Sequence, residues 1–188
     1  MQNSKYKINQ RFSTPSHVGF GIDRTYSLSD QHEYLCRCHA CRHWNLPEFN
    51  RKFIHLPGLP DHIEDLSHID EKIRARLRFD DSYVKCERCG APLDLDNSDL
   101  RSWVPKFPER SKDARGYYVR TFVTSRLDIP YIVDQLLRYK GLNFVRGWHN
   151  TVIGDAYTDH HARLNEADIR TNFVHPQEIE RAADEPAL

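Results

Sequence analysis

The chain has 188 residues, enough for one ordinary domain or two small ones, and its hydrophobic content of 39% predicts a small core. Lysine plus arginine and aspartate plus glutamate number 27 each, so the net charge of the whole chain indicates neither a nucleic acid nor a membrane as partner. No apolar stretch approaches the ~20 residues of a membrane span, and the first ten residues lack the apolar region of a signal peptide.

The first segment, residues 1–35, is punctuated by Pro15, Gly19 and Gly21. Such residues break regular structure, so residues 6–30 are predicted to form a short strand, a turn and a second extended piece.

The second segment, residues 36–104, contains all five cysteines and one predicted helix. Apolar residues recur at steps of three and four from Ile63 to Leu77, which is the spacing of one helix face. We therefore expect a helix over about 61–79, inserted between the cysteine pairs, with Asp61 as its N-cap.

The third segment, residues 105–175, begins with a basic stretch. Residues 101–126 carry seven Lys/Arg and two Asp/Glu, whereas residues 155–188 carry three Arg and eight Asp/Glu. The two regions could therefore have different partners, although a solvated surface explains each equally well. Beyond the basic loop the sequence predicts a strand at 117–123. A helix follows at about 129–139, with Asp128 as its cap and Gly141 at its end. The remaining predicted elements are a short strand and loop at 142–157, a weak helix at 161–170 and a tail at 176–188.

Four of the cysteines form two C-x-x-C pairs, Cys38 with Cys41 and Cys86 with Cys89. Two such pairs typically hold one Zn²⁺ ion, and a shell of four thiolates is closed, so the metal would be structural. The spacer of 44 residues exceeds that of a compact zinc ribbon, and the inserted helix accounts for the excess.

The turns of the two pairs differ in sequence. Gly90 follows the second pair and permits a left-handed conformation, whereas Arg42 occupies the matching position after the first pair and makes its turn less certain. Cys36 could replace Cys38, but we expect a small buried side chain outside the metal shell. His39 and His43 could also bind metal, although four thiolates already fill the shell. A redox C-x-x-C and unligated core thiols remain alternatives.

Basic side chains near the cysteines could form a face that follows a phosphate backbone, with Trp103 and Tyr117 stacking on bases. The candidate DNA contacts are Arg88, Lys106, Arg110, Lys112 and Arg115. A mobile basic loop without a ligand is an equally good interpretation. The sequence Asp159-His160-His161 has no evident partner set and is predicted to lie on the surface.

The order of several motifs over about residues 12–157 resembles viral DNA-packaging terminase large subunits. Ser13-Thr14-Pro15, two glycines, Ser29-Asp30 and the first cysteine pair follow one another as they do where the family's ATPase core runs into a cysteine knuckle. Downstream, the stretch that starts at Tyr117 and ends with Asn150, Gly154 and Tyr157 is similar to the segment that precedes the family's nuclease.

The resemblance implies that Ser13 and Thr14 occupy a position that couples nucleotide state to motion; a local Ser-Thr-Pro turn is the alternative. The full-length family members translocate and cleave viral DNA at the expense of ATP. This chain has no G-x-x-x-x-G-K-[ST] motif, no apolar run ending in paired acids and no nuclease strand with a metal-binding aspartate, so we expect no activity of its own.

We therefore expect an α+β fold made of a small zinc-ribbon module with a helical insertion, followed by a strand–helix connector. The leading hypothesis is a non-catalytic, zinc-binding middle region of a phage terminase large subunit in the host cytoplasm. Its partners would be double-stranded DNA and other motor parts, including the ATPase, the nuclease and the portal, and no membrane. The alternative is a stand-alone zinc-ribbon adaptor that binds nucleic acid or a protein.

Overall fold

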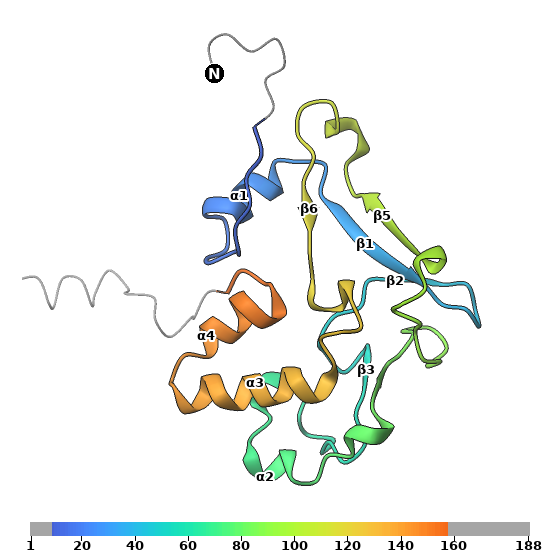
Figure 1. Cartoon of the computed structure of the whole chain (residues 1–188), viewed down its shortest axis with the longest axis vertical. Coiled ribbons are helices and arrows are strands. Elements are labelled where there is room, and N and C mark those ends of the chain that lie inside the picture. Colours follow the sequence, from blue (N-terminus) through green and yellow to red (C-terminus); the bar gives the residue numbers. More distant parts are fainter. Residues whose placement is uncertain (1–8, 158–188) are drawn as a thin grey trace, which may run out of the picture. The chain divides into compact units, whose positions relative to one another are not determined.

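A four-stranded sheet is built around β1 (His32–Arg37) in the computed structural model, which describes residues 9–157. β5 (Arg101–Pro105) pairs antiparallel with β1 along its whole length, as Figure 1 shows. β2 (Trp44–Asn45) pairs antiparallel with one end of β1, and β6 (Tyr117–Tyr118) pairs parallel with the other end. β1 therefore joins two distinct regions, one at each of its ends.

A second, two-stranded sheet brings the ends of the long spacer between the cysteine pairs together. β3 (Ile54–His55) pairs antiparallel with β4 (Tyr83–Val84), with Ile54 opposite Val84. These two residues are 30 positions apart in sequence but adjacent in the sheet. The pairing therefore brings the second cysteine pair, which follows β4, back towards the first.

The continuous helix predicted over 61–79 is replaced by short turns. The structure has a 3₁₀ turn η1 (Leu66–His68), a one-turn helix α2 (Glu71–Arg74) and a 3₁₀ turn η2 (Phe79–Asp81). The Asp65 and Asp70 carboxylates accept hydrogen bonds from the Ser67 and Ile73 N–H groups, so each aspartate starts a new turn instead of continuing one helix. The apolar spacing was nevertheless informative, because Ile63, Leu66, Ile69 and Leu77 are all buried.

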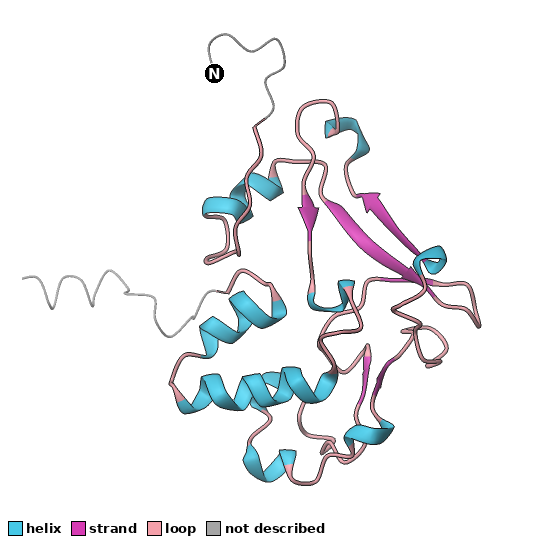
Figure 2. Ribbon diagram, in the orientation of Figure 1, coloured by secondary structure: helices cyan, strands magenta, loops and turns pink. Residues whose placement is uncertain are grey.

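The predicted helix near residue 129 is confirmed as α3 (Ile129–Gly141), visible in Figure 2. The Asp128 carboxylate accepts a hydrogen bond of 2.8 Å from the Tyr131 N–H, as expected of an N-cap. The strand and loop predicted over 142–157 are wrong: α4 (Val145–Trp148) continues into a π-helical turn (His149–Ile153). Aromatic and β-branched residues suggested a strand, but Trp148 is buried and donates its indole N–H to the Ile132 carbonyl, which fixes this segment against α3.

Two further expectations for short elements also fail. Within residues 6–30, the part the structure describes contains the helix α1 (Gly21–Ser27) and no strand. The strand predicted over 117–123 is limited to β6, after which the chain forms a 3₁₀ turn, η5 (Thr121–Val123). Two more 3₁₀ turns, η3 (Ser98–Leu100) and η4 (Pro108–Arg110), flank β5. The helix predicted at 161–170, Asp159-His160-His161 and the tail lie outside the described residues.

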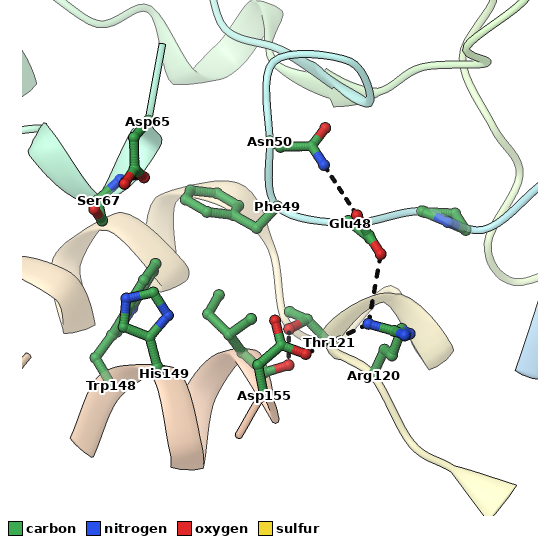
Figure 3. A pocket seen from close by; sticks show the side chains of 12 residues that line it. Glu48, Phe49, Asn50, Asp65, Ser67, Arg120, Thr121, Trp148, His149 and Asp155 are labelled. Atoms are coloured by element: carbon green, nitrogen blue, oxygen red, sulfur yellow. Dashed lines mark hydrogen bonds and ion pairs between the residues drawn. The ribbon is translucent and has the colours of Figure 1, made fainter. Parts of the chain in front are cut away.

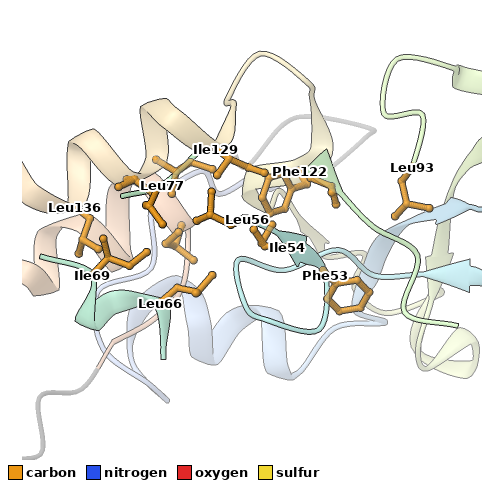
Figure 4. Packing of buried hydrophobic residues seen from close by; sticks show 14 of the residues in the cluster. Phe53, Ile54, Leu56, Leu66, Ile69, Leu77, Leu93, Phe122, Ile129 and Leu136 are labelled. Carbon is orange, nitrogen blue, oxygen red and sulfur yellow. The ribbon is translucent and has the colours of Figure 1, made fainter. Parts of the chain in front are cut away.

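One hydrophobic cluster runs from the cysteines to α3. Figure 4 shows part of it, from Leu93 to Leu136. The inner face of α3 packs against residues of the spacer, and each such side chain contributes roughly 1.5–3 kcal/mol when fully buried. The members of the cluster include Cys36, Cys86, Leu66, Ile69, Leu77, Ile132 and Leu136. Helices together with antiparallel sheets confirm the predicted α+β class. Within residues 9–157, no helix is both long and apolar enough to cross a membrane.

Candidate metal centre

The two C-x-x-C pairs form turns with the same backbone hydrogen bonds. In the first, the Cys38 N–H donates to the His43 carbonyl (2.8 Å) and the Arg42 N–H donates to the Cys38 carbonyl (3.0 Å). In the second, the Cys86 N–H donates to the Ala91 carbonyl (2.8 Å) and the Gly90 N–H to the Cys86 carbonyl (2.9 Å). We refer to residues 38–43 and 86–91 as knuckle 1 and knuckle 2.

Both knuckles require a left-handed residue just after the second cysteine. Gly90 has a φ of 74° and Arg42 a φ of 63°. The turn that seemed less certain from the sequence therefore forms in the same way, although a residue with a Cβ atom pays roughly 1–2 kcal/mol in this conformation.

The four predicted metal ligands come together. The sulfurs of Cys38, Cys41, Cys86 and Cys89 all lie within 4.8 Å of one another. The Cys38 and Cys89 sulfurs are 3.7 Å apart, and those of Cys41 and Cys86 are 3.6 Å apart. A zinc–sulfur bond of about 2.3 Å in a tetrahedron implies sulfur–sulfur edges of about 3.8 Å. Two of the separations match this edge, and the four thiols are close enough together to hold a metal ion.

The electrostatics of the cluster also favour a cation. Burial raises the pKa of Cys86, but the N–H groups of Cys89 and Arg88 and the Cys41 and Asn45 side chains lower it on balance to about 6. A hydrogen bond from Ala91 lowers the pKa of Cys89, yet the neighbouring sulfurs raise it on balance to about 12. The Cys86 thiol thus ionises readily, and its negative charge disfavours ionisation of the neighbouring thiols. All four thiols can be ionised together only if a positive ion lies between the sulfurs.

Asn45, which sequence reasoning missed, holds the two knuckles together. Its side chain is fully buried and donates to the Cys36 (3.3 Å) and His43 (3.0 Å) carbonyls. Its amide oxygen accepts from the Glu87 N–H in knuckle 2 (3.0 Å). No motif marks this residue, because its role depends on two loops that are about forty positions apart in sequence.

The remaining nearby candidates lie outside the sulfur cluster. Cys36 is fully buried and directs its thiol to the Asp94 carbonyl at 3.7 Å, in line with the bystander role predicted for it. His39 is exposed, and His43 hydrogen-bonds Glu87 at 2.7 Å. Bonds from Lys52 and His43 lower the pKa of Glu87. His43 therefore supports the centre by pairing with knuckle 2.

The basic loop, residues 106–116, is held in place by the buried carboxylate of Asp30. Asp30 accepts from the Ser111 hydroxyl (2.6 Å) and the Gly116 N–H (3.0 Å), and it pairs with His32 (2.8 Å). Burial raises the pKa of Asp30, but these hydrogen bonds lower it below its ordinary value on balance. The loop is consequently an ordered structure anchored to the start of β1.

The structure does not unite the five predicted DNA contacts. Lys106, Lys112 and Arg115 are exposed on the basic loop, but Arg110 stacks on Phe107 (4.0 Å) and donates to the Ser27 carbonyl (3.3 Å). Arg88 lies in knuckle 2, beyond the opposite end of β1. At about 3.3 Å per residue, β1 alone spans about 17 Å, so Arg88 and the basic loop are separate surfaces.

The two predicted stacking residues belong to an aromatic row on the sheet. Trp103 contacts Tyr34 (ring centroids 4.7 Å apart) and Tyr117 (5.3 Å). Tyr117 is 51% exposed and stacks on His32 at 4.5 Å. The row leads from the middle of β1 to its basic-loop end, so aromatic and basic groups are continuous there.

Residues from the two ends of the terminase-like stretch meet in space. The Asn150 side chain donates to the Ser16 carbonyl at 3.0 Å. Ser13 and Thr14 are exposed, and the Ser13 hydroxyl donates to the Thr14 carbonyl. Residues 13–15 form no turn, so the structure does not contain the local Ser-Thr-Pro turn that was the alternative to a coupling role.

No family model, curated protein or solved structure matches this chain.

Proposed function

We propose that this chain is a zinc-stabilised, non-catalytic module of a phage DNA-packaging terminase large subunit, where it contacts double-stranded DNA. The observation that carries the metal part of the proposal is the convergence of four cysteine sulfurs within 4.8 Å. The family part rests on the order of the sequence motifs from Ser13 to Gly154.

A single tetrahedral metal ion suits the site, and zinc is the ion we propose. Four thiolates in a tetrahedron are typical of zinc or of iron–sulfur centres, and a single ion fits the sulfur separations of 3.6 and 3.7 Å. When bound, the ion would supply folding energy by gathering four thiolates, with Cys38, Cys41, Cys86 and Cys89 as ligands. The protein's part is to hold the two knuckles at the correct separation through Asn45.

Elemental analysis of the purified protein tests the metal. We expect one equivalent of zinc, because a closed structural site stays filled in folded protein. Less than about half an equivalent in undenatured protein would contradict the proposal.

The ordered basic loop supports DNA binding. Lys106, Lys112 and Arg115 have no ion-pair partner among residues 9–157, and the buried Asp30 keeps the loop that carries them in one conformation. Cations presented by an anchored loop lose less conformational freedom when they meet phosphates than cations on a mobile loop.

Replacing Lys106, Lys112 and Arg115 together by Gln tests the DNA surface. Loss of three phosphate contacts should reduce the slope of log K against log salt by about 2.7 for duplex DNA. The matched control replaces three exposed basic residues elsewhere, Lys72, Arg76 and Arg138, by Gln. An unchanged slope in the loop variant, or an equal loss in the control, would refute the assigned surface.

The aromatic row favours one other function, an adaptor for single-stranded nucleic acid. Stacking on an aromatic side chain contributes about 1–3 kcal/mol per base and requires unpaired bases. The adaptor should prefer single strands, and Trp103→Leu should weaken that binding. Trp44→Leu, an exposed tryptophan at the knuckle end of β1, is the control. A preference for duplex DNA that Trp103→Leu leaves intact would exclude the adaptor.

A further inference from the structure

A cavity of about 170 Å³ lies between the spacer and the C-terminal helical segment, away from the four cysteines. Figure 3 shows Asp65 on one side of it, Glu48 on another, His149 in the π-helical turn that follows α4, and Asp155 just beyond that turn. Its volume slightly exceeds the roughly 150 Å³ of an engineered protein cavity that accommodates benzene. A planar group of a few heavy atoms therefore fits.

The polar lining carries excess negative charge. The lining contains three carboxylates, those of Glu48, Asp65 and Asp155, and one guanidinium, that of Arg120, which gives a net charge of −2 with His149 neutral. Arg120 is already engaged, because it binds Glu33 through two hydrogen bonds of 2.9 and 3.0 Å and pairs more loosely with Glu48 (3.5 Å) and Asp155 (3.4 Å), which leaves Asp65 without a cationic partner among residues 9–157. The cavity is thus suited to a cation that enters from outside.

Several hydrogen-bond acceptors of the lining are unused. Asp65 accepts the Ser67 N–H through Oδ1, and Asp155 accepts the Tyr118 hydroxyl and Arg120 through its own Oδ1. Within the described part of the chain, neither Oδ2 atom and neither ring nitrogen of His149 has a hydrogen-bond partner. Burial lowers the pKa of His149 although Asp65 and Asp155 raise it, so the ring is neutral and can accept a hydrogen bond.

The apolar lining is aromatic. Phe49 and Trp148 meet edge to face with centroids 5.8 Å apart, and both border the cavity. Aromatic rings attract cations that are delocalised and weakly hydrated, above all guanidinium.

A metal ion does not suit this lining. Among residues 9–157, the four cysteines are the only group of three or more potential ligands whose donor atoms converge to metal-binding distance. The hydrogen-bond acceptors that line the cavity are instead spread around an open space. Such an arrangement suits a ligand with several separated N–H donors.

We propose that this cavity binds a guanidinium group, carried either by a small organic cation or by an arginine side chain of a partner protein. Planar shape, delocalised charge and five N–H donors match the space, the aromatic edge and the unused carboxylate and imidazole acceptors. The inference is independent of the zinc and DNA-binding proposals.

Calorimetric titration of the full-length protein with methylguanidinium tests this assignment. Methylurea, a neutral molecule of similar shape, is the ligand control and should not bind detectably. Asp65→Asn removes one charge but keeps an N-capping side chain, and it should weaken methylguanidinium binding by about tenfold or more. The matched variant Glu64→Gln removes the neighbouring exposed charge, which does not line the cavity, and should bind normally.

A blocked arginine, N-acetylarginine methylamide, separates the two sources of the group. Binding at least about tenfold tighter than that of methylguanidinium assigns the site to a protein side chain, because further contacts add to affinity; equal or weaker binding assigns it to a small cation. The proposal is overturned if neither guanidinium binds, if methylurea binds as well, or if a folded Asp65→Asn protein with the wild-type melting temperature binds with unchanged affinity.

Discussion

Knuckles 1 and 2 have the same backbone hydrogen bonds but different sequences. Knuckle 2 has Gly90 at the left-handed position, with a φ of 74°, whereas knuckle 1 has Arg42 there, with a φ of 63°. Knuckle 2 follows the short strand β4, whereas knuckle 1 joins β1 to β2 in the main sheet. Knuckle 2 is flanked only by the isolated bridge between Lys85 and Pro92, whereas knuckle 1, which lacks the glycine, joins two strands of the main sheet.

The comparison shows that two turns of one cysteine cluster can be held by partly different means. Knuckle 2 relies on its own residues, since glycine adopts the conformation without a steric penalty. Knuckle 1 lacks this glycine and is held by the pairing of β1 with β2, while Asn45 supports both knuckles through the His43 carbonyl and the Glu87 N–H. The experiments below test whether the metal depends equally on both knuckles and how each one is held.

Removing a ligand from either knuckle should have the largest effect. Cys38→Ser and Cys86→Ser should each abolish stable zinc binding and forfeit a large share of the roughly 10–16 kcal/mol that a structural zinc contributes. Zinc content and melting temperature measure both losses. Cys36→Ser is the control because its thiol points to the Asp94 carbonyl, and it should retain zinc even if the buried substitution lowers stability. Loss of zinc in the control would place Cys36 in the metal shell.

Cutting the link between the knuckles should have the next largest effect. Asn45→Ala leaves the Glu87 N–H without its partner and removes one of the two donors to the His43 carbonyl, which should cost about 1–3 kcal/mol of unfolding free energy. Denaturant titration of the zinc-loaded protein measures it. Asn97→Ala removes only the cap of a short exposed turn and should cost about 1 kcal/mol or less. Equal losses in the two variants would mean that Asn45 does not couple the knuckles.

The metal cluster was far more predictable from the sequence than its support. Paired cysteines at fixed spacing identify the four thiols, because each C-x-x-C turn is local. Asn45 and Asp30 act through contacts with loops distant in sequence, so no local pattern reveals them. The sequence could not show for the same reason that the five candidate DNA contacts lie on two separate surfaces: Arg88 and the basic loop are brought to opposite ends of β1 by strand pairing.

The fold was predictable where a capped helix has one apolar face. α3 has such a pattern together with Asp128 and Gly141 at its ends. The spacer has the same apolar spacing, but Asp65 and Asp70 interrupt it with their own turns. In the segment from Val145 to Ile153, burial of Trp148 against α3 outweighs the strand preference of its residues.

Adding a Cβ atom to the left-handed position of knuckle 2 tests how that turn is held. Gly90→Ala should lower the unfolding free energy by about 1–2 kcal/mol, because the φ of 74° is unfavourable for alanine. Space is not the cause, since nothing lies within 4 Å of the added atom. Gly141→Ala adds the same atom in open space at the end of α3 without a positive φ and should not destabilise. A neutral result for Gly90→Ala would show that the turn tolerates any residue.

The reverse substitution in knuckle 1 should have the smallest effect and the opposite sign. Arg42→Gly relieves the left-handed strain at a φ of 63° but gives the unfolded chain more freedom, so the net gain should be about 0.5–1 kcal/mol. The substitution stabilises the protein only if the strain relieved at this position exceeds the extra conformational entropy that glycine gives the unfolded chain. Arg37→Gly, a residue of β1 in extended conformation, should destabilise and is the control. Destabilisation by Arg42→Gly would show that the sheet holds the turn so firmly that the arginine is not strained, and the two knuckles would then differ in mechanism as well as in sequence.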